Sequence, residues 1–247
     1  MLHIYGTKAA RKIIYLLSFI CIVFSQQVDA QLFKNDSGSS MDEKDYFFGI
    51  TLGTTRTGFG ARMHPRFLQD DSVYVAEPGF SSGFQLGLSA TARISEHFQV
   101  RFNPQLMFFD RPIRYSLKYP DYTTGALEAT KKVESVNLSF PIQGKFLSDR
   151  IGNFRFYALG GVKADIDLAS NADARKAEDL VKIKPNDFGL ELGLGGSFYF
   201  KSFTLSPELK FSNGLNNLHS RDNNLIYSSV FDKIYSRMIV FCIHIEG

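Results

Sequence analysis

Apolar and polar side chains alternate along most of this chain with a period of two residues. From position 186 to 200 the even positions are mostly apolar and the odd positions are polar or small. Lys201 and Ser202 form a tight turn in this pattern, and the alternation resumes from 203 to 215. Because side chains along a strand point alternately to opposite faces, the pattern predicts a β-hairpin with one apolar face and one polar face.

Six further segments carry the same alternation, which is weakest in the last of them. Together with the hairpin they predict eight strands, and the connections between successive strands alternate between long and short. Outer-membrane barrels have this arrangement, with short periplasmic turns and longer extracellular loops. The chain is therefore predicted to be all-β, an eight-stranded antiparallel up-and-down transmembrane β-barrel in the bacterial outer membrane. The six segments are 46–56, 82–93, 98–110, 133–146, 154–168 and 234–246.

Three of the long connections carry further information. Residues 57–81 form a long connection that contains several glycines and prolines. Apolar residues at alternate positions from 113 to 119 indicate that the third strand projects past the membrane. Residues 172–181 are predicted to form a short helix.

The first thirty residues have the features of a targeting segment. Lys8, Arg11 and Lys12 precede an apolar run at 13–24, which is too short to span a bilayer comfortably. The small residue Ala30 ends a cleavage-site pattern. We expect a signal peptide at 1–30, a polar periplasmic tail at 31–45 and the barrel domain at 46–247. The alternative for the first segment is an N-terminal membrane anchor.

Alternation alone does not reveal which face of a strand points into the barrel. A lipocalin has eight strands with its apolar face inside, and a secreted β-sandwich also has alternating strands. An eight-stranded barrel, however, encloses only enough room for side chains to fill. The apolar faces carry too many aromatic rings for that space, so we expect them to face lipid.

The polar faces are expected to fill the lumen with charges of both signs. In the predicted hairpin Gly195 faces Glu208 and Gly193 faces Lys210, so each long charged side chain lies opposite a glycine. We predict a plugged interior with paired charges rather than a conducting pore. The expected members of this lumen charge network are Arg101, Lys145, Lys163, Glu191, Glu208 and Lys210.

Composition and motifs give little indication of catalysis. The net charge is +3, without a run of basic residues interleaved with aromatics, so nucleic-acid binding is not expected. His219-Ser220 with a nearby acid would imitate a lipid hydrolase, but the pair is expected to be solvated. Asp165 and Asp167 are too few ligands for calcium. Cys242 is alone once the signal is removed, so no disulfide is expected. We expect no catalytic residues, metal, cofactor or small-molecule substrate.

Basic residues gather near the long connections, where the outer rim of the barrel would meet lipid headgroups. Such residues are candidates for contacts with the phosphates of outer-membrane lipid and lipopolysaccharide. The alternative is scattered, solvated charge. The candidates are Arg111, Arg114, Lys131 and Lys132.

Four segments of the chain, taken in order, resemble the PorT family of outer-membrane barrels, also called SprT. They are HFQVRFNPQLMF (97–108), VESVNLSFPIQGKF (133–146), FRFYALGGVKADIDLAS (154–170) and LSPELKFSNGLNNL (205–218). The resemblance covers nearly all of 46–245, although the long connections show no similarity.

This resemblance implies a non-enzymatic component of the type IX secretion system, which exports proteases and adhesins with C-terminal sorting domains and supports gliding motility. Its implied partners are other components of that system. The resemblance carries no catalytic motif. The alternatives are a generic small barrel for adhesion or envelope integrity and an outer-membrane lipid-modifying enzyme.

Overall fold

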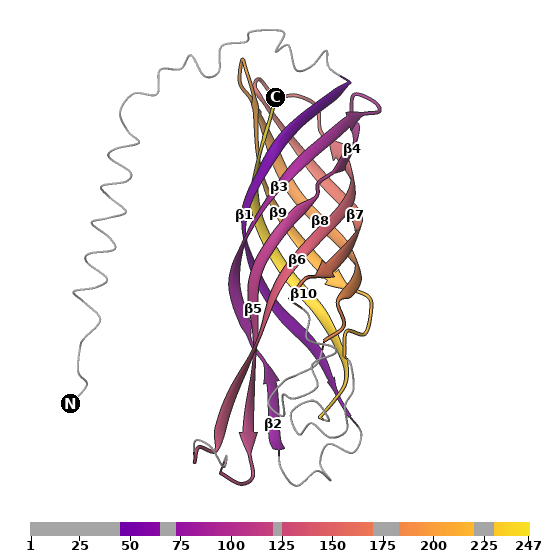
Figure 1. Ribbon diagram of the computed structural model, residues 1–247. Helices are drawn as coiled ribbons and strands as arrows, with labels where there is room; N and C mark the ends of the chain where they lie inside the picture. Colours follow the sequence, from indigo (N-terminus) through magenta and orange to yellow (C-terminus); the bar gives the residue numbers. More distant parts are fainter. Residues whose placement is uncertain (1–44, 65–72, 121–124, 170–182, 220–229) are drawn as a thin grey trace, which may run out of the picture. The chain divides into compact units, whose positions relative to one another are not determined.

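The computed structural model describes residues 45–64, 73–120, 125–169, 183–219 and 230–247 (Figure 1). The expected signal peptide, nearly all of the expected tail and the expected helix at 172–181 lie outside these residues. Among the described residues, no helix is both long and apolar enough to cross a membrane.

All regular structure in the described residues is β-strand. Ten strands form a single antiparallel sheet. They are β1 (Tyr46–Met63), β2 (Val73–Pro78), β3 (Phe80–Arg93), β4 (Phe98–Phe102), β5 (Gln105–Leu117), β6 (Glu128–Leu147), β7 (Phe154–Asp167), β8 (Asn186–Tyr199), β9 (Thr204–Gly214) and β10 (Phe231–Glu246).

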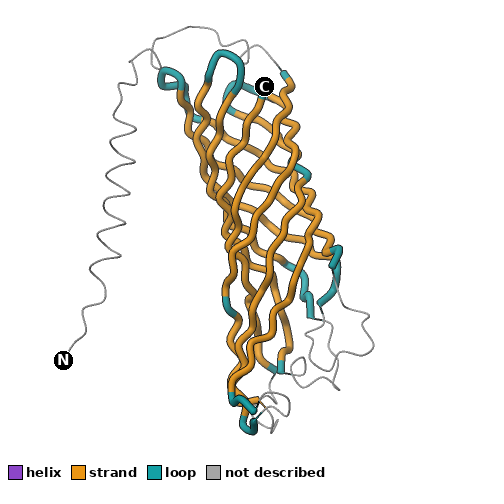
Figure 2. Tube along the Cα trace, turned by 60° about the vertical axis from the view of Figure 1, so that its left-hand side comes forward, coloured by secondary structure: helices purple, strands orange, loops and turns teal. Residues whose placement is uncertain are grey.

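The sheet closes into a barrel because β1 pairs with both β3 and β10. β4 and β5 lie end to end between β3 and β6, in one continuous register, so they are two halves of one barrel strand. Eight strands therefore surround the lumen, and Figure 2 shows the closed barrel that they form. The predicted eight-stranded antiparallel barrel is confirmed, and β2 is an additional strand outside this count.

The interruption between β4 and β5 falls at Asn103 and Pro104. Pro104 has no N–H to donate to the ladder. The neighbouring groups keep their bonds: Asn103 N donates to Pro141 O over 3.2 Å and Leu88 N donates to Pro104 O over 2.9 Å. The predicted continuous strand is therefore broken at one point while its register is preserved.

The strands extend further than predicted at the end where the long connections leave the barrel, which we call the outer end. β1 continues to Met63, and β5 continues to Leu117 as the alternation at 113–119 predicts. β2 lies within the long connection 57–81 and pairs with β5 from Val73 to Pro78. β2, β5 and β6 thus form a three-stranded extension at the outer end (Figure 1).

The opposite end of the barrel, the short-turn end, carries the connections 93–98, 147–154 and 199–204 and the C-terminus (Figure 1). Along the strands between the two ends, apolar side chains point outward and polar ones inward. Phe48 and Leu192 are each 67% exposed, whereas Arg101 and Lys210 are 0% exposed. A soluble protein rarely exposes so extended an apolar surface, and a lipid-facing barrel requires it.

The interior differs from the expected polar filling at its outer end. There, an apolar cluster joins barrel residues to parts of the long connections, among them Ile183, Leu218 and Val230. These connection residues are fixed by backbone bonds, such as Lys184 N to Leu218 O and His64 N to Val230 O. Apolar burial fills this end because described residues at the ends of the connections pack against the barrel wall. Sequence alternation could not reveal that, since it describes the barrel wall alone.

Candidate functional site

The lumen near the short-turn end contains a compact group of polar side chains. Gly195 lies opposite Glu208 and Gly193 opposite Lys210, as predicted from the hairpin. Gly195 leaves space for a ring, because a Cβ there would lie 2.4 Å from Cζ of Tyr157. The glycines of β8 thus admit long side chains from the strands on either side.

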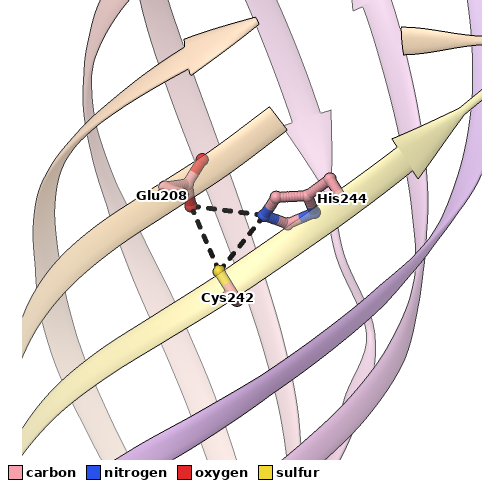
Figure 3. Close-up of side chains that lie close together, drawn as sticks. All are labelled: Glu208, Cys242 and His244. Atoms are coloured by element: carbon pink, nitrogen blue, oxygen red, sulfur yellow. Dashed lines mark hydrogen bonds and ion pairs between the residues drawn. The ribbon is translucent and has the colours of Figure 1, made fainter. Parts of the chain in front are cut away.

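Glu208 on β9 meets two side chains of β10. Cys242 lies directly across the ladder from Glu208, and His244 is the next inward-facing residue on the same strand. The Cys242 Sγ is 3.9 Å from Glu208 Oε1 and 3.4 Å from His244 Nε2. His244 Nε2 is 3.4 Å from Glu208 Oε1. All three side chains are buried and point toward one another (Figure 3).

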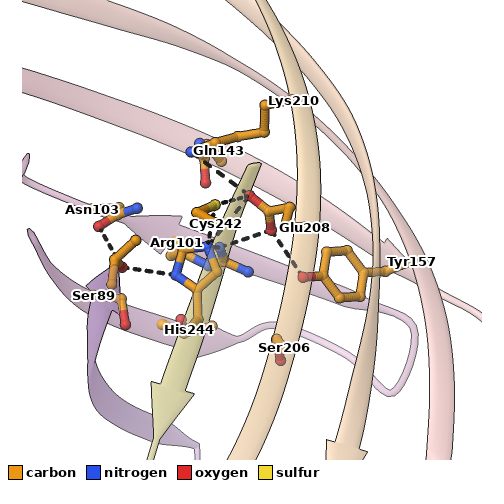
Figure 4. A network of polar contacts seen from close by, with 12 residues as sticks. Ser89, Arg101, Asn103, Gln143, Tyr157, Ser206, Glu208, Lys210, Cys242 and His244 are labelled. Atoms are coloured by element: carbon orange, nitrogen blue, oxygen red, sulfur yellow. Dashed lines mark hydrogen bonds and ion pairs between the residues drawn. The ribbon is translucent and has the colours of Figure 1, made fainter. Parts of the chain in front are cut away.

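The same carboxylate accepts hydrogen bonds from other parts of the barrel (Figure 4). Arg101 Nη1 donates to Glu208 Oε2 over 3.0 Å, and the Tyr157 hydroxyl donates to the same oxygen over 2.9 Å. Lys210 Nζ lies 3.7 Å from Glu208 Oε1. Arg101 also reaches Glu246, with 3.8 Å between Nε and Oε1. Both members of the central ion pair are 0% exposed.

The orientation of His244 follows from its neighbours. Its Nε2 is 2.9 Å from Arg101 Nη1, and a guanidinium can only donate, so Nε2 accepts. The proton of the neutral ring is therefore on Nδ1, which lies 2.8 Å from the Thr51 hydroxyl. Thr51 in turn donates to Asn103 Oδ1 over 3.1 Å. A chain of three hydrogen bonds thus fixes the ring.

The six residues expected to form the lumen charge network are all buried inside the barrel, and direct contacts join three of them. Arg101, Glu208 and Lys210 are joined. Lys163 pairs with Asp165 over 2.6 Å. Glu191 accepts a hydrogen bond from Gln143 over 2.7 Å. Lys145 lies 4.2 Å from the centroid of the Tyr157 ring.

Sequence reasoning missed several members of the central group, namely Thr51, Tyr157, Cys242, His244 and Glu246. The alternation in β10 carries a signal for three of them, because even positions from 238 to 246 all face inward. The sequence does not indicate that these residues form a polar group in the lumen, because neighbouring inward positions, such as Met238 and Val240, are apolar.

Among the four rim cations, Arg111 is placed differently from the expectation. It is 2% exposed and faces the lumen, where its guanidinium lies 4.6 Å from the Phe59 ring and 4.7 Å from the Phe109 ring. The expected contact of Arg111 with lipid phosphate is therefore wrong, because odd positions of β5 point inward. Arg114 and Lys132 are exposed, Lys131 is half-buried, and Lys132 Nζ lies 3.6 Å from Asp110 Oδ2.

Two other sequence candidates have structural partners. Asp165 accepts a hydrogen bond from Ser139 over 2.5 Å in addition to its ion pair with Lys163. His219 is buried against Phe231, contrary to the expectation that it is solvated. Ser220 lies outside the described residues, so the expectation that this residue is solvated remains a prediction.

Comparisons with known proteins identify the class of this barrel. A family model described as outer membrane protein beta-barrel domain matches residues 29–220. The chain belongs to this outer-membrane β-barrel family, and the protein is located in the bacterial outer membrane. No curated protein matches the chain.

Several solved outer-membrane proteins match the chain at low sequence identity. The Neisserial surface protein A is 12% identical, with a TM-score of 0.40 and coverage of 80% of this chain and 95% of that protein. OprG from Pseudomonas aeruginosa is 13% identical, with a TM-score of 0.43 and coverage of 80% and 94%. The outer membrane protease OmpT from Escherichia coli is 10% identical, with a TM-score of 0.41 and coverage of 90% and 98%. The assignment rests on the family match.

Proposed function

We propose that this protein is a non-enzymatic outer-membrane component of the type IX secretion system, required for export of proteins that carry C-terminal sorting domains. The resemblance of four segments to the PorT family supports the system, and the filled lumen supports the role. Because the Arg101–Glu208 group and the apolar cluster occupy the interior, exported proteins would not pass through this barrel. Its role is then to support the translocation apparatus.

The three-stranded extension of β2, β5 and β6 offers a surface for partner proteins. β6 pairs with β7 only from Asn137 onward, so the extension begins where β6 leaves the barrel wall. Tyr74 on β2 is 67% exposed, and Tyr119 and Leu127, in the connection between β5 and β6, are 67% and 55% exposed. Exposed aromatic and apolar residues beyond the lipid-facing band are typical of protein contact surfaces. We assign contacts with other secretion components to this surface.

Contacts with lipid are assigned to the barrel wall and to three cations on the part of β5 and β6 that leaves it. Arg114, Lys131 and Lys132 are the remaining candidates for lipid or lipopolysaccharide phosphates. A guanidinium can bind a phosphate through two parallel hydrogen bonds, and an ammonium acts as a point charge. Lys132 also lies near Asp110, so its share of such a contact is the smallest.

Gene deletion with complementation tests the proposed function. Loss of secreted protease activity, restored by the wild-type gene, is expected, because cargo with a C-terminal sorting domain would remain in the cell. A complementing variant with Tyr74→Ser and Tyr119→Ser should assemble in the membrane but secrete poorly. Normal secretion with a fragile envelope would refute the proposal and favour a general envelope barrel. Altered lipid A in mass spectra would favour a lipid-modifying enzyme.

A further inference from the structure

Three different metal-ligand types meet inside the barrel, in a cluster that the proposed function does not use. Glu208 offers a carboxylate oxygen, Cys242 a sulfur and His244 an imidazole nitrogen, and these atoms all lie within 4.8 Å of one another (Figure 3). The three side chains come from adjacent strands in a continuous ladder, so the backbone holds them without a flexible loop.

The spacing of the ligand atoms matches a tetrahedral ion of the zinc class. Zinc bonds of roughly 2.0 Å to oxygen and nitrogen and 2.3 Å to sulfur place neighbouring ligand atoms about 3.3–3.6 Å apart. The observed separations are 3.4 Å for sulfur to nitrogen, 3.4 Å for nitrogen to oxygen and 3.9 Å for sulfur to oxygen. Two edges already fit, and the third needs a movement of a few tenths of an ångström.

His244 makes the kind of second hydrogen bond that holds metal-binding histidines in place. Such a histidine usually passes its second ring N–H to an oxygen, which fixes the ring and its tautomer. Here Nδ1 lies 2.8 Å from the Thr51 hydroxyl, and Nε2 is the nitrogen that faces Glu208 and Cys242. The lone pair that a metal would use therefore points into the cluster.

A cation already lies at this place, because Arg101 Nη1 donates to both His244 Nε2 and Glu208 Oε2. Metal binding requires Arg101 to leave Nε2, and Glu246, 3.8 Å from Arg101 Nε, provides an alternative partner. The Cys242 thiol would lose its proton to water as sulfur binds the ion. Glu208 and the thiolate would then balance the two charges of the metal.

The lumen has a recess two residues along β10 from His244. It lies at the short-turn end and is lined by Lys145, Tyr199 and Glu246, among others. Glu246 is two residues from His244 on β10, a distance of about 7 Å along the strand. An ion entering the recess would thus meet the carboxylate of Glu246 before the cluster.

We propose that Glu208, Cys242 and His244 form a binding site for a borderline-soft divalent cation of the zinc class inside the barrel. Thr51 is its positioning residue, and Arg101 competes with the ion for His244 Nε2. A water would complete the fourth coordination position. The site is independent of the secretion role.

Metal loading of the full-length protein tests this proposal. The protein is purified in detergent, stripped with EDTA, incubated with Zn²⁺ or Co²⁺ and desalted. One equivalent of metal is expected by mass spectrometry, and the cobalt form should show thiolate-to-metal charge-transfer absorption. Cys242→Ser should abolish that absorption, and His244→Gln should abolish metal retention. Thr51→Val should weaken affinity by about 10- to 100-fold, as loss of a supporting hydrogen bond does in metal sites.

A matched control is His97→Gln, which removes an exposed histidine paired with Asp149 at 3.0 Å in a short turn. This variant should retain one equivalent of metal and the full absorption. Folding of every variant is checked by the mobility of unheated protein on gels. If His244→Gln does not fold, the near-isosteric Cys242→Ser decides. Absence of stoichiometric metal in the wild type, or unchanged cobalt absorption in Cys242→Ser, would overturn the proposal.

Discussion

Replacement of Glu208 by glutamine should destabilise the barrel more than any comparable change on its outside. Glutamine keeps the shape and an oxygen to which Tyr157 and Arg101 can donate, but it removes the negative charge that balances Arg101 in a fully buried position. Removing one partner of a buried pair costs about 3–5 kcal/mol. Glu246 lies 3.8 Å from Arg101 and offsets part of this loss, so we expect about 3 kcal/mol.

The free energy of unfolding can be measured by urea titration of the protein in lipid vesicles containing EDTA, which separates the effect from metal binding. The chain has 11 tyrosines and no tryptophan, so tyrosine fluorescence and gel mobility report the transition. Glu134→Gln, an exposed position on β6, is the matched control and should stay within about 0.5 kcal/mol of wild type.

A double-mutant cycle isolates the pair itself. If Arg101 and Glu208 stabilise each other, Arg101→Gln and Glu208→Gln should together cost less than the sum of the single changes, by about 1 kcal/mol or more. The reasoning fails if Glu208→Gln behaves like Glu134→Gln, or if the two costs simply add. Either result would mean that water or another group compensates Arg101.

Three further predictions test other parts of the structure. Gly195→Val should lower the free energy of unfolding by about 2 kcal/mol or more, because the new side chain would overlap Tyr157. Gly160→Ala is the control and should lower it little, since the nearest atom to its Cβ is Leu192 Cδ2 at 3.3 Å. Equal losses for the two variants in urea titrations would contradict this. The purified barrel should give no steady current in planar bilayers, since its lumen is filled, and stable channels would argue against the packing described above. Arg114→Gln, Lys131→Gln and Lys132→Gln together should reduce co-purified lipopolysaccharide, while Arg111→Gln should lower stability and leave the lipid unchanged.

The barrel could be predicted from the sequence because the alternation of side chains that specifies it lies within each single strand. Each wall residue faces either lipid or the lumen, and this contrast repeats every two residues along one strand. The tight turn at Lys201 also sets the register of β8 and β9, so the pairing of Gly195 with Glu208 follows from counting. The parity of β5 also places Arg111 inside the barrel, whereas its nearness to a long connection predicts the rim.

Other features depend on contacts that no single segment records. β2 has six residues and lies beyond the barrel, where the contrast between lipid and lumen no longer applies. Arg101 on β4 and Glu208 on β9 are 107 residues apart, and the stagger of the closed barrel decides that they meet. Their signs were evident from the sequence. Their direct partners were not, since Lys163 contacts Asp165 and Glu191 contacts Gln143.

The two ends of the lumen are filled by different interactions, polar contacts at one end and apolar burial at the other. At the short-turn end, ion pairs and hydrogen bonds hold side chains of the wall to one another across a narrow space. At the outer end, apolar burial fixes Ile183, Leu218 and Val230 of the long connections onto the wall. Those connections therefore leave the barrel from fixed points beside the extension of β2, β5 and β6. The residues at these points are already ordered by the barrel, so the entropy of ordering them is not a cost to anything that binds there.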